Sequence, residues 1–555
     1  MEVYFDPGYH PNLDLNRLVN GWRKSGIRVV HVAAWHFWPE TLDKSGHRRT
    51  GYVFDYRKLI DLCHRQGITA YAWFELPMVT PKFWQEHPEW REKTASGADG
   101  HVGWRKLMNL YNPAARQAAV ALVRNLVETE DWDGVDLGEM SFDAADNFLD
   151  PAKFVPMNAD VRQEFRRRQG FDPIELFQKG SRRHWERAPK DLEAFLNFRV
   201  EIVTGMHRAL LEELEPVRQK KGLEIVVTML DSLHSPRIRR QIGVDSLEIV
   251  KLMDRFPFTL QVEDPSEFWA ASPERYRDFG RTYRALVKDP SRLMFDVNVV
   301  SDRTMGPSDL PSQLATGTEF ARLLLAASAP TGRAAIYSEW TVTPQDWQWA
   351  GAVLASETRV TSYDGADIWQ VDGPHAVALR IPRDVRAIFV DGKPWPVFEE
   401  GSVLIPAGKH LLTFSRPGSL GSWMDVEQLQ ARMHSISGEL LDAGVTRRGL
   451  EFSYDSPGRC VAVFSKQPYR VRVDGREWSS APLYSRGEWA LVLPAGRHSV
   501  DLVANETAVF VVEAASLFSS WLIVAFGTVS CGAMAGLYTF VRLQRAVRNW
   551  RRWKA

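Results

Sequence analysis

The chain has 555 residues, 45% of them hydrophobic and 25% charged, which excludes a largely disordered protein and allows two to four folded domains. The 69 basic residues balance the 69 acidic ones, so overall charge gives no argument for nucleic-acid binding. The three cysteines fall in different predicted domains without metal-ligand or redox spacing, which predicts no disulfide framework.

Residues 1–356 alternate strand-like and helix-like segments. The helical patterns include LDLNRLVNGWRKSG, NPAARQAAVALVRNLVE and EFARLLLAASA. Eight strands, each followed by a helix, predict an α/β fold, a (β/α)8 TIM barrel. The predicted strands are Glu2–Phe5, Ile27–Ala34, Thr69–Leu76, Gly134–Glu139, Glu224–Leu230, Phe258–Glu263, Leu293–Val300 and Arg333–Trp340.

A long insertion follows the fourth predicted strand, over residues 141–190. Segments that follow barrel strands lie at the catalytic face. We therefore expect this insertion to shape a substrate cleft.

Short alternating strands with Gly-rich turns follow the barrel, and they contain an internal repeat. One copy reads VDGKPW and then LIPAGKH, and the other reads VDGREW and then LVLPAGRH. The Asp-Gly pairs are hairpin signals. The pattern predicts two β-sandwich modules, at 357–417 and 437–513, joined by a linking helix over 418–436. They either cover the barrel and space it from a membrane, or bind carbohydrate.

Residues 517–541 form an uncharged segment that is long enough to cross a bilayer. Trp521 and Tyr538 lie near its two ends. The tail at 542–555 carries only basic charges, so the positive-inside rule predicts a cytoplasmic C-terminus. The barrel is then extracytoplasmic, in the periplasm or at the cell surface. The opening MEVYFDPGYH shows no export signal, so we expect this chain to be a fragment, to have a misassigned start, or to belong to a longer polypeptide.

The 21 tryptophans favour a sugar site, because flat indole faces stack on the apolar faces of pyranose rings. The ends of the predicted strands are rich in acids, as glycoside hydrolysis requires: one acid protonates the departing oxygen and a second carboxylate attacks or activates water. We predict Glu139 as acid/base and Glu263 as its partner, with Asp264, Asp296 and Glu339 as rivals for the partner role. The predicted substrate-binding residues are Asp6, Trp35, His36, Trp73, Glu75, Asp264, Asp296, Glu339 and Trp340.

Two other functions remain open. A non-catalytic barrel could bind polysaccharide as a scaffold. A metal-dependent deacetylase could take ligands from Asp6 with His10, or from His31 with His36, although the latter pair falls on opposite faces of a regular strand. The sequence shows no nucleotide or serine-hydrolase motif in a convincing context, and we expect no cofactor.

The stretches DPGYHPNLDLNRLVNGWRKSGIRVVHVAAW, YRKLIDLCHRQGITAYAWFELP and WDGVDLGEM resemble the family-10-like glycosyl hydrolases. They also resemble the hydrolase half of bacterial exopolysaccharide proteins that carry an upstream polysaccharide deacetylase domain. The resemblance covers about residues 1–356. It implies a polysaccharide substrate, exopolysaccharide biosynthesis or export proteins as partners, and an export signal upstream. The chitinase pattern DGxDxDxE is broken at Gly138, so a chitinase mechanism is not implied.

Overall fold

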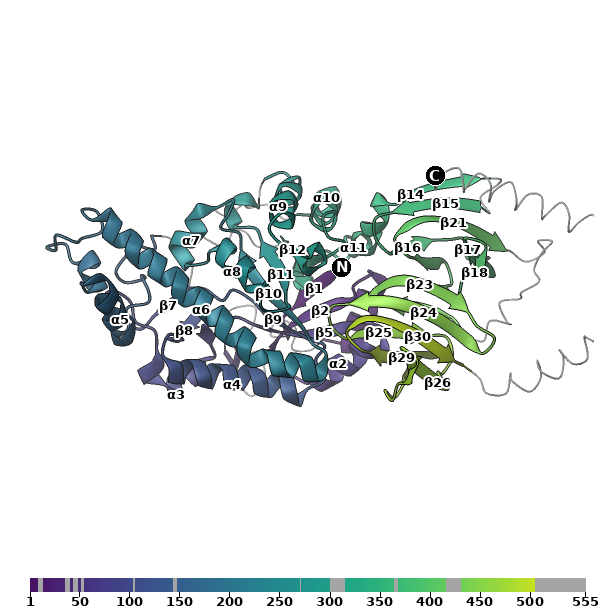
Figure 1. Cartoon of the computed structure of the whole chain (residues 1–555), viewed down its shortest axis with the longest axis horizontal. Helices are drawn as coiled ribbons and strands as arrows, with labels where there is room; N and C mark the ends of the chain where they lie inside the picture. Colours follow the sequence, from purple (N-terminus) through teal and green to yellow (C-terminus); the bar gives the residue numbers. More distant parts are fainter. Residues whose placement is uncertain are drawn as a thin grey trace, which may run out of the picture. The chain divides into compact units, whose positions relative to one another are not determined.

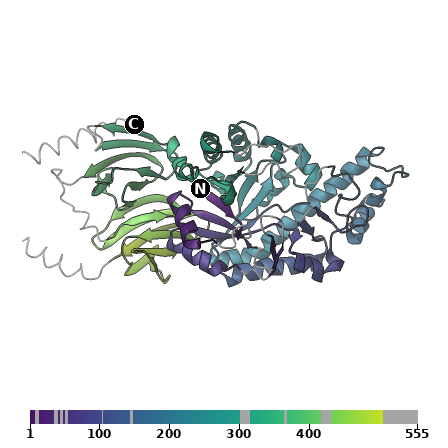
Figure 2. The same ribbon diagram turned by 180° about the vertical axis from the view of Figure 1, so that it is seen from behind.

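The computed structural model describes residues 1–7, 13–34, 40–42, 48–50, 54–102, 105–142, 147–269, 271–299, 315–363, 368–415 and 431–504. The chain divides into two compact units. The first contains residues 1–61 and 69–350, and the second contains residues 62–68 and the chain from 351 onward. Figures 1 and 2 show a barrel surrounded by helices in the first unit and layered β-sheets in the second.

Eight parallel strands close a barrel, which confirms the predicted architecture. The sheet closes where Glu2 of the first strand pairs with Ala335 of the last. The strands are short apolar segments whose inward and outward side chains are both buried, as expected for a parallel sheet covered by helices. In chain order they are β1 (Glu2–Phe5), β2 (Val29–Ala33), β5 (Thr69–Phe74), β9 (Gly134–Leu137), β10 (Glu224–Leu230), β11 (Thr259–Glu263), β12 (Leu293–Asn298) and β13 (Ala334–Tyr337).

Local signals set the helix boundaries. Asn112 caps α4 by accepting from the backbone N–H groups of Ala114 and Ala115, and a proline follows it at the first helical position. Gly222 ends α6 in the left-handed conformation, with φ 69°. The helices are α1 (Leu15–Lys24), α2 (Tyr56–Arg65), α3 (Pro81–Glu86), α4 (Pro113–Thr129), α5 (Ala159–Gln169), α6 (Pro189–Lys221), α7 (Pro236–Ile242), α8 (Ser246–Leu252), α9 (Arg275–Arg284), α10 (Gly317–Ser328) and α11 (Trp347–Ala352).

Two insertions extend from the carboxyl ends of the barrel strands. The one after β5 folds into a three-stranded sheet of β6 (Met78–Val79), β8 (Arg105–Leu107) and β7 (His101–Val102). The one after β9 carries α5 and the 3-10 turn η4 (Pro173–Phe177). A hairpin of β3 (Glu40–Leu42) and β4 (Arg48–Thr50) follows β2.

A charged network fills the amino-terminal end of the barrel interior. The ring nitrogens of His31 lie 2.9 Å from Asp136 and 2.9 Å from Glu2, and Arg333 donates to both Glu2 and Glu224. Burial alone would lower the pKa of His31, but the hydrogen bonds to the two carboxylates outweigh it and raise that pKa to about 9. The imidazole therefore carries a positive charge at neutral pH, which balances part of the negative charge buried around it.

The second unit consists of antiparallel sheets. The first half forms a five-stranded sheet in the order β14-β15-β21-β17-β18 and a three-stranded sheet β16-β20-β19. These strands are β14 (Arg359–Tyr363), β15 (Ile368–Gly373), β16 (Val377–Arg380), β17 (Ala387–Val390), β18 (Lys393–Pro394), β19 (Phe398–Glu399), β20 (Ser402–Ile405) and β21 (Gly408–Ser415).

The second half of this unit repeats the plan, with a four-stranded sheet β22-β25-β29-β28 and a five-stranded sheet β23-β24-β30-β26-β27. Buried side chains of both halves, among them Leu412, Met433 and Leu491, belong to one continuous hydrophobic core. The strands are β22 (Met433–Ile436), β23 (Glu439–Val445), β24 (Gly449–Ser456), β25 (Cys460–Phe464), β26 (Arg470–Val473), β27 (Arg476–Glu477), β28 (Leu483–Ser485), β29 (Glu488–Leu493) and β30 (Gly496–Val503).

The C-terminal boundary of the predicted linking helix, at residue 436, is wrong. Residues 433–436 form β22, while residues 416–430 lie outside the described part of the chain. Met433 and Ile436 are both buried three positions apart, a spacing that favours a helix in the sequence. A bulge between Met433 and Ser435 shifts the strand register and lets both side chains face the core.

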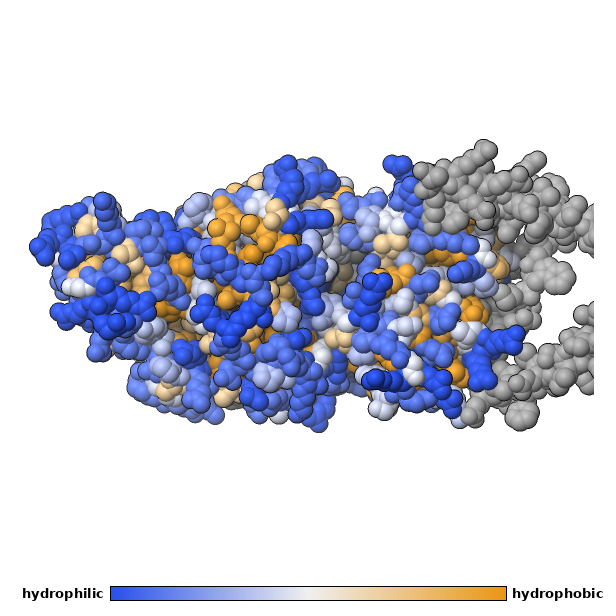
Figure 3. Space-filling view, in the orientation of Figure 1, coloured by the Kyte–Doolittle hydropathy of each residue, from blue (hydrophilic) through white to orange (hydrophobic). Residues whose placement is uncertain are grey.

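Among the described helices, none has the length and apolar character needed to span a bilayer. The predicted transmembrane segment at 517–541 and the basic tail at 542–555 lie outside the described residues. Figure 3 shows a largely hydrophilic face with scattered apolar residues on the described part of the chain.

Candidate active site

The predicted acids lie at the carboxyl ends of the barrel strands. Asp6 follows β1, Glu75 follows β5, and Glu139 stands two residues beyond β9. Glu263 ends β11, Asp296 lies in β12, and Glu339 begins the 3-10 turn η7 (Glu339–Thr341) after β13. Because all eight strands are parallel and the barrel is closed, these ends face the same side of the molecule.

Glu139 has an unusual backbone and a charged partner. Its φ is 46°, a left-handed conformation that costs free energy for any residue with a Cβ and is found most often at functional sites. Its carboxylate oxygen lies 2.6 Å from a guanidinium nitrogen of Arg105, which comes from β8 of the neighbouring insertion. Both side chains are partly exposed, so this ion pair is accessible from solvent.

Trp73 explains why no acid stands at position 138. Its indole lies so close to Gly138 that a Cβ there would overlap Trp73 Nε1. Trp73 is buried inside the barrel, where its ring packs edge-on against Tyr4 and Tyr337. A glycine is therefore required at 138, and the first acid after β9 is Glu139.

Glu263 lies in an environment that favours its protonated form. Burial and the negative charge of Glu139 raise the pKa of Glu263 to about 8, even though the Asn298 side-chain amide donates to it at 3.2 Å. Glu263 therefore holds a proton at neutral pH. Two carboxyl groups in one site thus have different protonation states, which is the arrangement that acid/base catalysis uses.

Two further acids belong to the same group. Burial and the charge of Glu139 raise the pKa of Glu75 well above its usual value. Burial raises the pKa of Asp296 well above its usual value, and the neighbouring Glu263 carboxyl raises it further when Glu263 is ionised. Both carboxyls are more than 90% buried, so the structure favours their neutral, hydrogen-bond-donating forms.

Asp264 lies next to Glu263 in sequence but has a different environment. Its fully buried carboxylate accepts from Arg275 at 2.8 Å and from the Tyr276 hydroxyl at 2.9 Å, both on α9. These contacts attach α9 to the end of β11. They favour a bracing role for Asp264 over contact with a ligand.

The remaining predicted residues divide into two groups. Glu339 is buried and Trp340 is partly buried, both in η7. Trp35, His36 and His10 lie outside the described residues. His31, a ligand in the deacetylase alternative, has both ring nitrogens bonded to carboxylates inside the barrel, so it is not available at the mouth. In the described part of the barrel, no three His, Cys, Asp or Glu side chains lie close enough to share a metal ion.

Arg105 and Asn298 are site residues that the sequence prediction did not include. Asn298 stands two positions after Asp296 in β12, so strand alternation places both on one face and could have identified it. Arg105 reaches Glu139 through the folding of the β6-β8-β7 sheet. No local pattern in the sequence links these two residues.

No protein-family model and no curated protein sequence matches this chain. Solved structures do match. A β-galactosidase from the psychrophilic Marinomonas ef1 is 10% identical with a TM-score of 0.44, over 64% of this chain and 59% of that one. A β-galactosidase from the haloarchaeon Halorubrum lacusprofundi is 11% identical with a TM-score of 0.45, over 91% and 99%. A maltogenic α-amylase from Thermotoga neapolitana is 12% identical with a TM-score of 0.35, over 75% and 96%.

The barrel fold rests on the closed ring of eight parallel strands. These neighbours add no support for the family-10-like resemblance. At identities near 10% and TM-scores below 0.5, the likeness carries no argument about activity. The argument for a function rests on the chemistry of the barrel mouth.

Proposed function

We propose that the barrel is a glycoside hydrolase that cleaves a polysaccharide by paired-carboxylate chemistry. One observation carries the proposal: an ionised carboxylate paired with an arginine, Glu139, stands beside a protonated carboxyl, Glu263, whose pKa is raised to about 8. Hydrolysis of a glycosidic bond needs one proton donor and one negatively charged group, and these two residues supply them.

The electrostatics favour exchanging the two roles expected from the sequence. Glu263 keeps its proton at neutral pH and donates it to the departing glycosidic oxygen. Glu139 stays ionised beside Arg105 and either attacks the anomeric carbon or activates a water molecule. After bond cleavage, Glu263 has lost its proton and can accept one from the incoming water.

Other residues bind the sugar in this proposal. The protonated carboxyls of Glu75 and Asp296 donate hydrogen bonds to hydroxyl oxygens. The partly buried Trp340 is assigned a stacking role in this proposal, and Trp73 lies beside Gly138. Asp6 and Glu339 contact further hydroxyls, together with Trp35 and His36 from the segment after β2.

The sequence features beyond the barrel define the proposed setting. The uncharged segment 517–541 anchors the protein in a membrane and the basic tail lies in the cytoplasm. The barrel then acts outside the cytoplasm, on an exported or cell-surface polysaccharide, beside proteins of exopolysaccharide biosynthesis or export.

A leaving-group comparison tests the two catalytic roles. A good leaving group, such as dinitrophenolate, departs without protonation, so an aryl glycoside carrying it needs Glu139 but not Glu263. Glu263→Gln should keep most of the wild-type kcat/KM on this substrate, because kcat/KM reports bond cleavage and not the later attack of water, and it should lose about 100-fold or more of kcat/KM on the natural glycosidic bond. Glu139→Gln should lose activity on both substrates. Equal losses of both variants on the dinitrophenyl substrate would contradict the assignment.

A further inference from the structure

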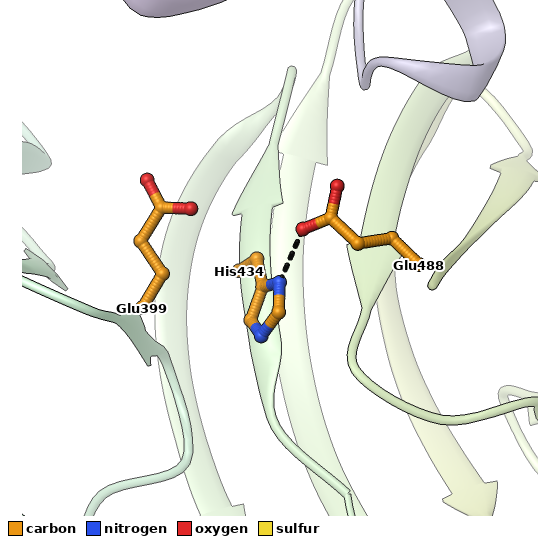
Figure 4. Close-up of side chains that lie close together, drawn as sticks. All are labelled: Glu399, His434 and Glu488. Atoms are coloured by element: carbon orange, nitrogen blue, oxygen red, sulfur yellow. Dashed lines mark hydrogen bonds and ion pairs between the residues drawn. The ribbon is translucent and has the colours of Figure 1, made fainter. Parts of the chain in front are cut away.

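Three side chains that can bind metals converge in the second unit. Glu399 ends β19, His434 lies in β22, and Glu488 begins β29 (Figure 4). The backbone brings them together: Val397 forms a parallel bridge with Met433, and β22 pairs with β25, which pairs with β29. The cluster therefore joins a strand of the first half of the unit to two strands of the second half.

The ligand atoms are close enough to share one ion. Each of the three residues offers one atom, and these atoms all lie within 4.8 Å of one another. A cation at their centre would stand no more than about 2.8 Å from each, so small side-chain shifts reach the ~2.0–2.2 Å that Zn²⁺ takes with imidazole and carboxylate. His434 Nδ1 already lies 2.5 Å from a carboxylate oxygen of Glu488.

The charge in this cluster favours a cation. Figure 4 shows the carboxylates of Glu399 and Glu488 on the two sides of His434, whose Nδ1 is bonded to Glu488. The side chains of His434 and Glu488 are only 12% and 21% exposed, so water screens the two negative charges incompletely. A divalent ion placed among the three side chains would be attracted by both carboxylates.

The hydrogen bonding of His434 differs from that of His410 and His498, the histidines of the two repeated hairpins. His410 and His498 each have both ring nitrogens bonded, one to an aspartate and one to a backbone carbonyl. His434 Nε2 is buried and has no hydrogen-bond partner among the described residues. Its ring is held on the Nδ1 side alone, so it can turn to meet an ion between the carboxylates.

We propose that Glu399, His434 and Glu488 bind a divalent transition-metal ion of the Zn²⁺ type that ties the two halves of the unit together. The imidazole ligand favours this class over Ca²⁺ and Mg²⁺, which prefer oxygen ligands alone. The ion is structural and leaves one coordination position to water. The proposal does not depend on the function of the barrel, because none of its residues lies in the first unit.

Thermal unfolding of the full-length, EDTA-treated protein with added ZnCl₂ tests this site. At a hundredfold excess over Kd, Zn²⁺ should raise the Tm of the wild type by about 5 to 10 °C. Titration calorimetry should give one high-affinity ion per chain. Glu399→Gln and His434→Gln keep the side-chain size and a polar terminus, and both should lose the Tm shift.

His410→Gln is the matched control, because this histidine lies in the same unit and its nitrogens are already bonded; its Zn²⁺ response should equal that of the wild type. Visible absorption of Co²⁺ bound to the wild type gives a second readout that requires no variant to fold. The site is overturned if His434→Gln and Glu399→Gln keep the full shift, which would place Zn²⁺ elsewhere, or if the wild type shows no shift and no Co²⁺ bands.

Discussion

The protonation states of two glutamates carry the functional account. Burial and the negative charge of Glu139 keep the proton on Glu263, and Glu139 itself forms an ion pair with Arg105. The left-handed backbone at Glu139, with φ 46°, costs folding free energy for a residue with a Cβ, and such conformations cluster at functional sites.

The raised pKa of Glu263 predicts a pH dependence of activity. A general acid must be protonated, so the rate on a natural glycosidic bond should fall about tenfold per pH unit above about 8. Glu263→Gln should lack this alkaline decrease on a dinitrophenyl substrate. A wild-type rate that stays constant from pH 7 to pH 10 would contradict the acid role.

The same pKa shift has a consequence for stability. The folded-state pKa of Glu263 lies above its unfolded value. Its stabilising contribution to the free energy of unfolding is therefore complete below the unfolded pKa of 4.5 and is lost as the pH rises through about 8. Glu263→Gln should therefore unfold at a higher temperature than the wild type at pH 9 and not at pH 4. The exposed control Glu248→Gln should show no such difference between the two pH values.

At the scale of elements, the repeat in the second unit is a hairpin fastened by an aspartate and a histidine. In both copies the Asp-Gly pair has positive φ at each residue, as a type I′ turn requires. Asp391 accepts from His410 and from Leu411 N, and Asp474 accepts from His498 and from Ser499 N. The aspartate and the histidine thus meet in both copies although 19 residues separate them in the first copy and 24 in the second, so the shared VDG and PAG-basic-His motifs have a structural role.

Removing these aspartates should destabilise the unit to different degrees. Asp391→Ala loses hydrogen bonds of a carboxylate that is 25% exposed, and should lower the free energy of unfolding by about 1–3 kcal/mol. Asp474 is 53% exposed, so Asp474→Ala should cost less, about 1 kcal/mol or below. Urea unfolding checks both, with the exposed Asp455→Ala as the control. A larger loss for Asp474→Ala would contradict the burial argument.

The elements show which parts of this fold follow from sequence. The eight barrel strands could be predicted because buried parallel strands are short apolar segments between helical patterns, as Glu224–Leu230 illustrates. β22 could not, because a bulge gives Met433 and Ile436 the spacing of a helix. The acids at strand ends could be located by topology, whereas the partnership of Arg105 with Glu139 depends on how an insertion folds. Protonation states depend on burial and neighbouring charges in three dimensions, so the roles of Glu139 and Glu263 needed the structure.

At the scale of the whole molecule, the account proposes an enzyme attached to a membrane. A chain ending at residue 515 should appear in the soluble fraction, whereas the full-length protein and a chain ending at 541 should stay with membranes after a carbonate wash. The chain ending at 541 tests the apolar segment without the basic tail, because the segment is present in both membrane-bound forms and the tail only in the full-length protein. Full-length protein in the soluble fraction would contradict the anchor and leave the proposal for the barrel unchanged.

The most direct test of the central claim is reducing-end release by the full-length protein from a panel of bacterial exopolysaccharides and hexosamine polymers. We expect release by the wild type and by the control Glu248→Gln. Glu139→Gln and Glu263→Gln should each lose about 100-fold or more of this activity, with glycan binding retained. Glycan binding without release by any form would indicate a scaffold, and release that survives both substitutions would place the chemistry at other residues.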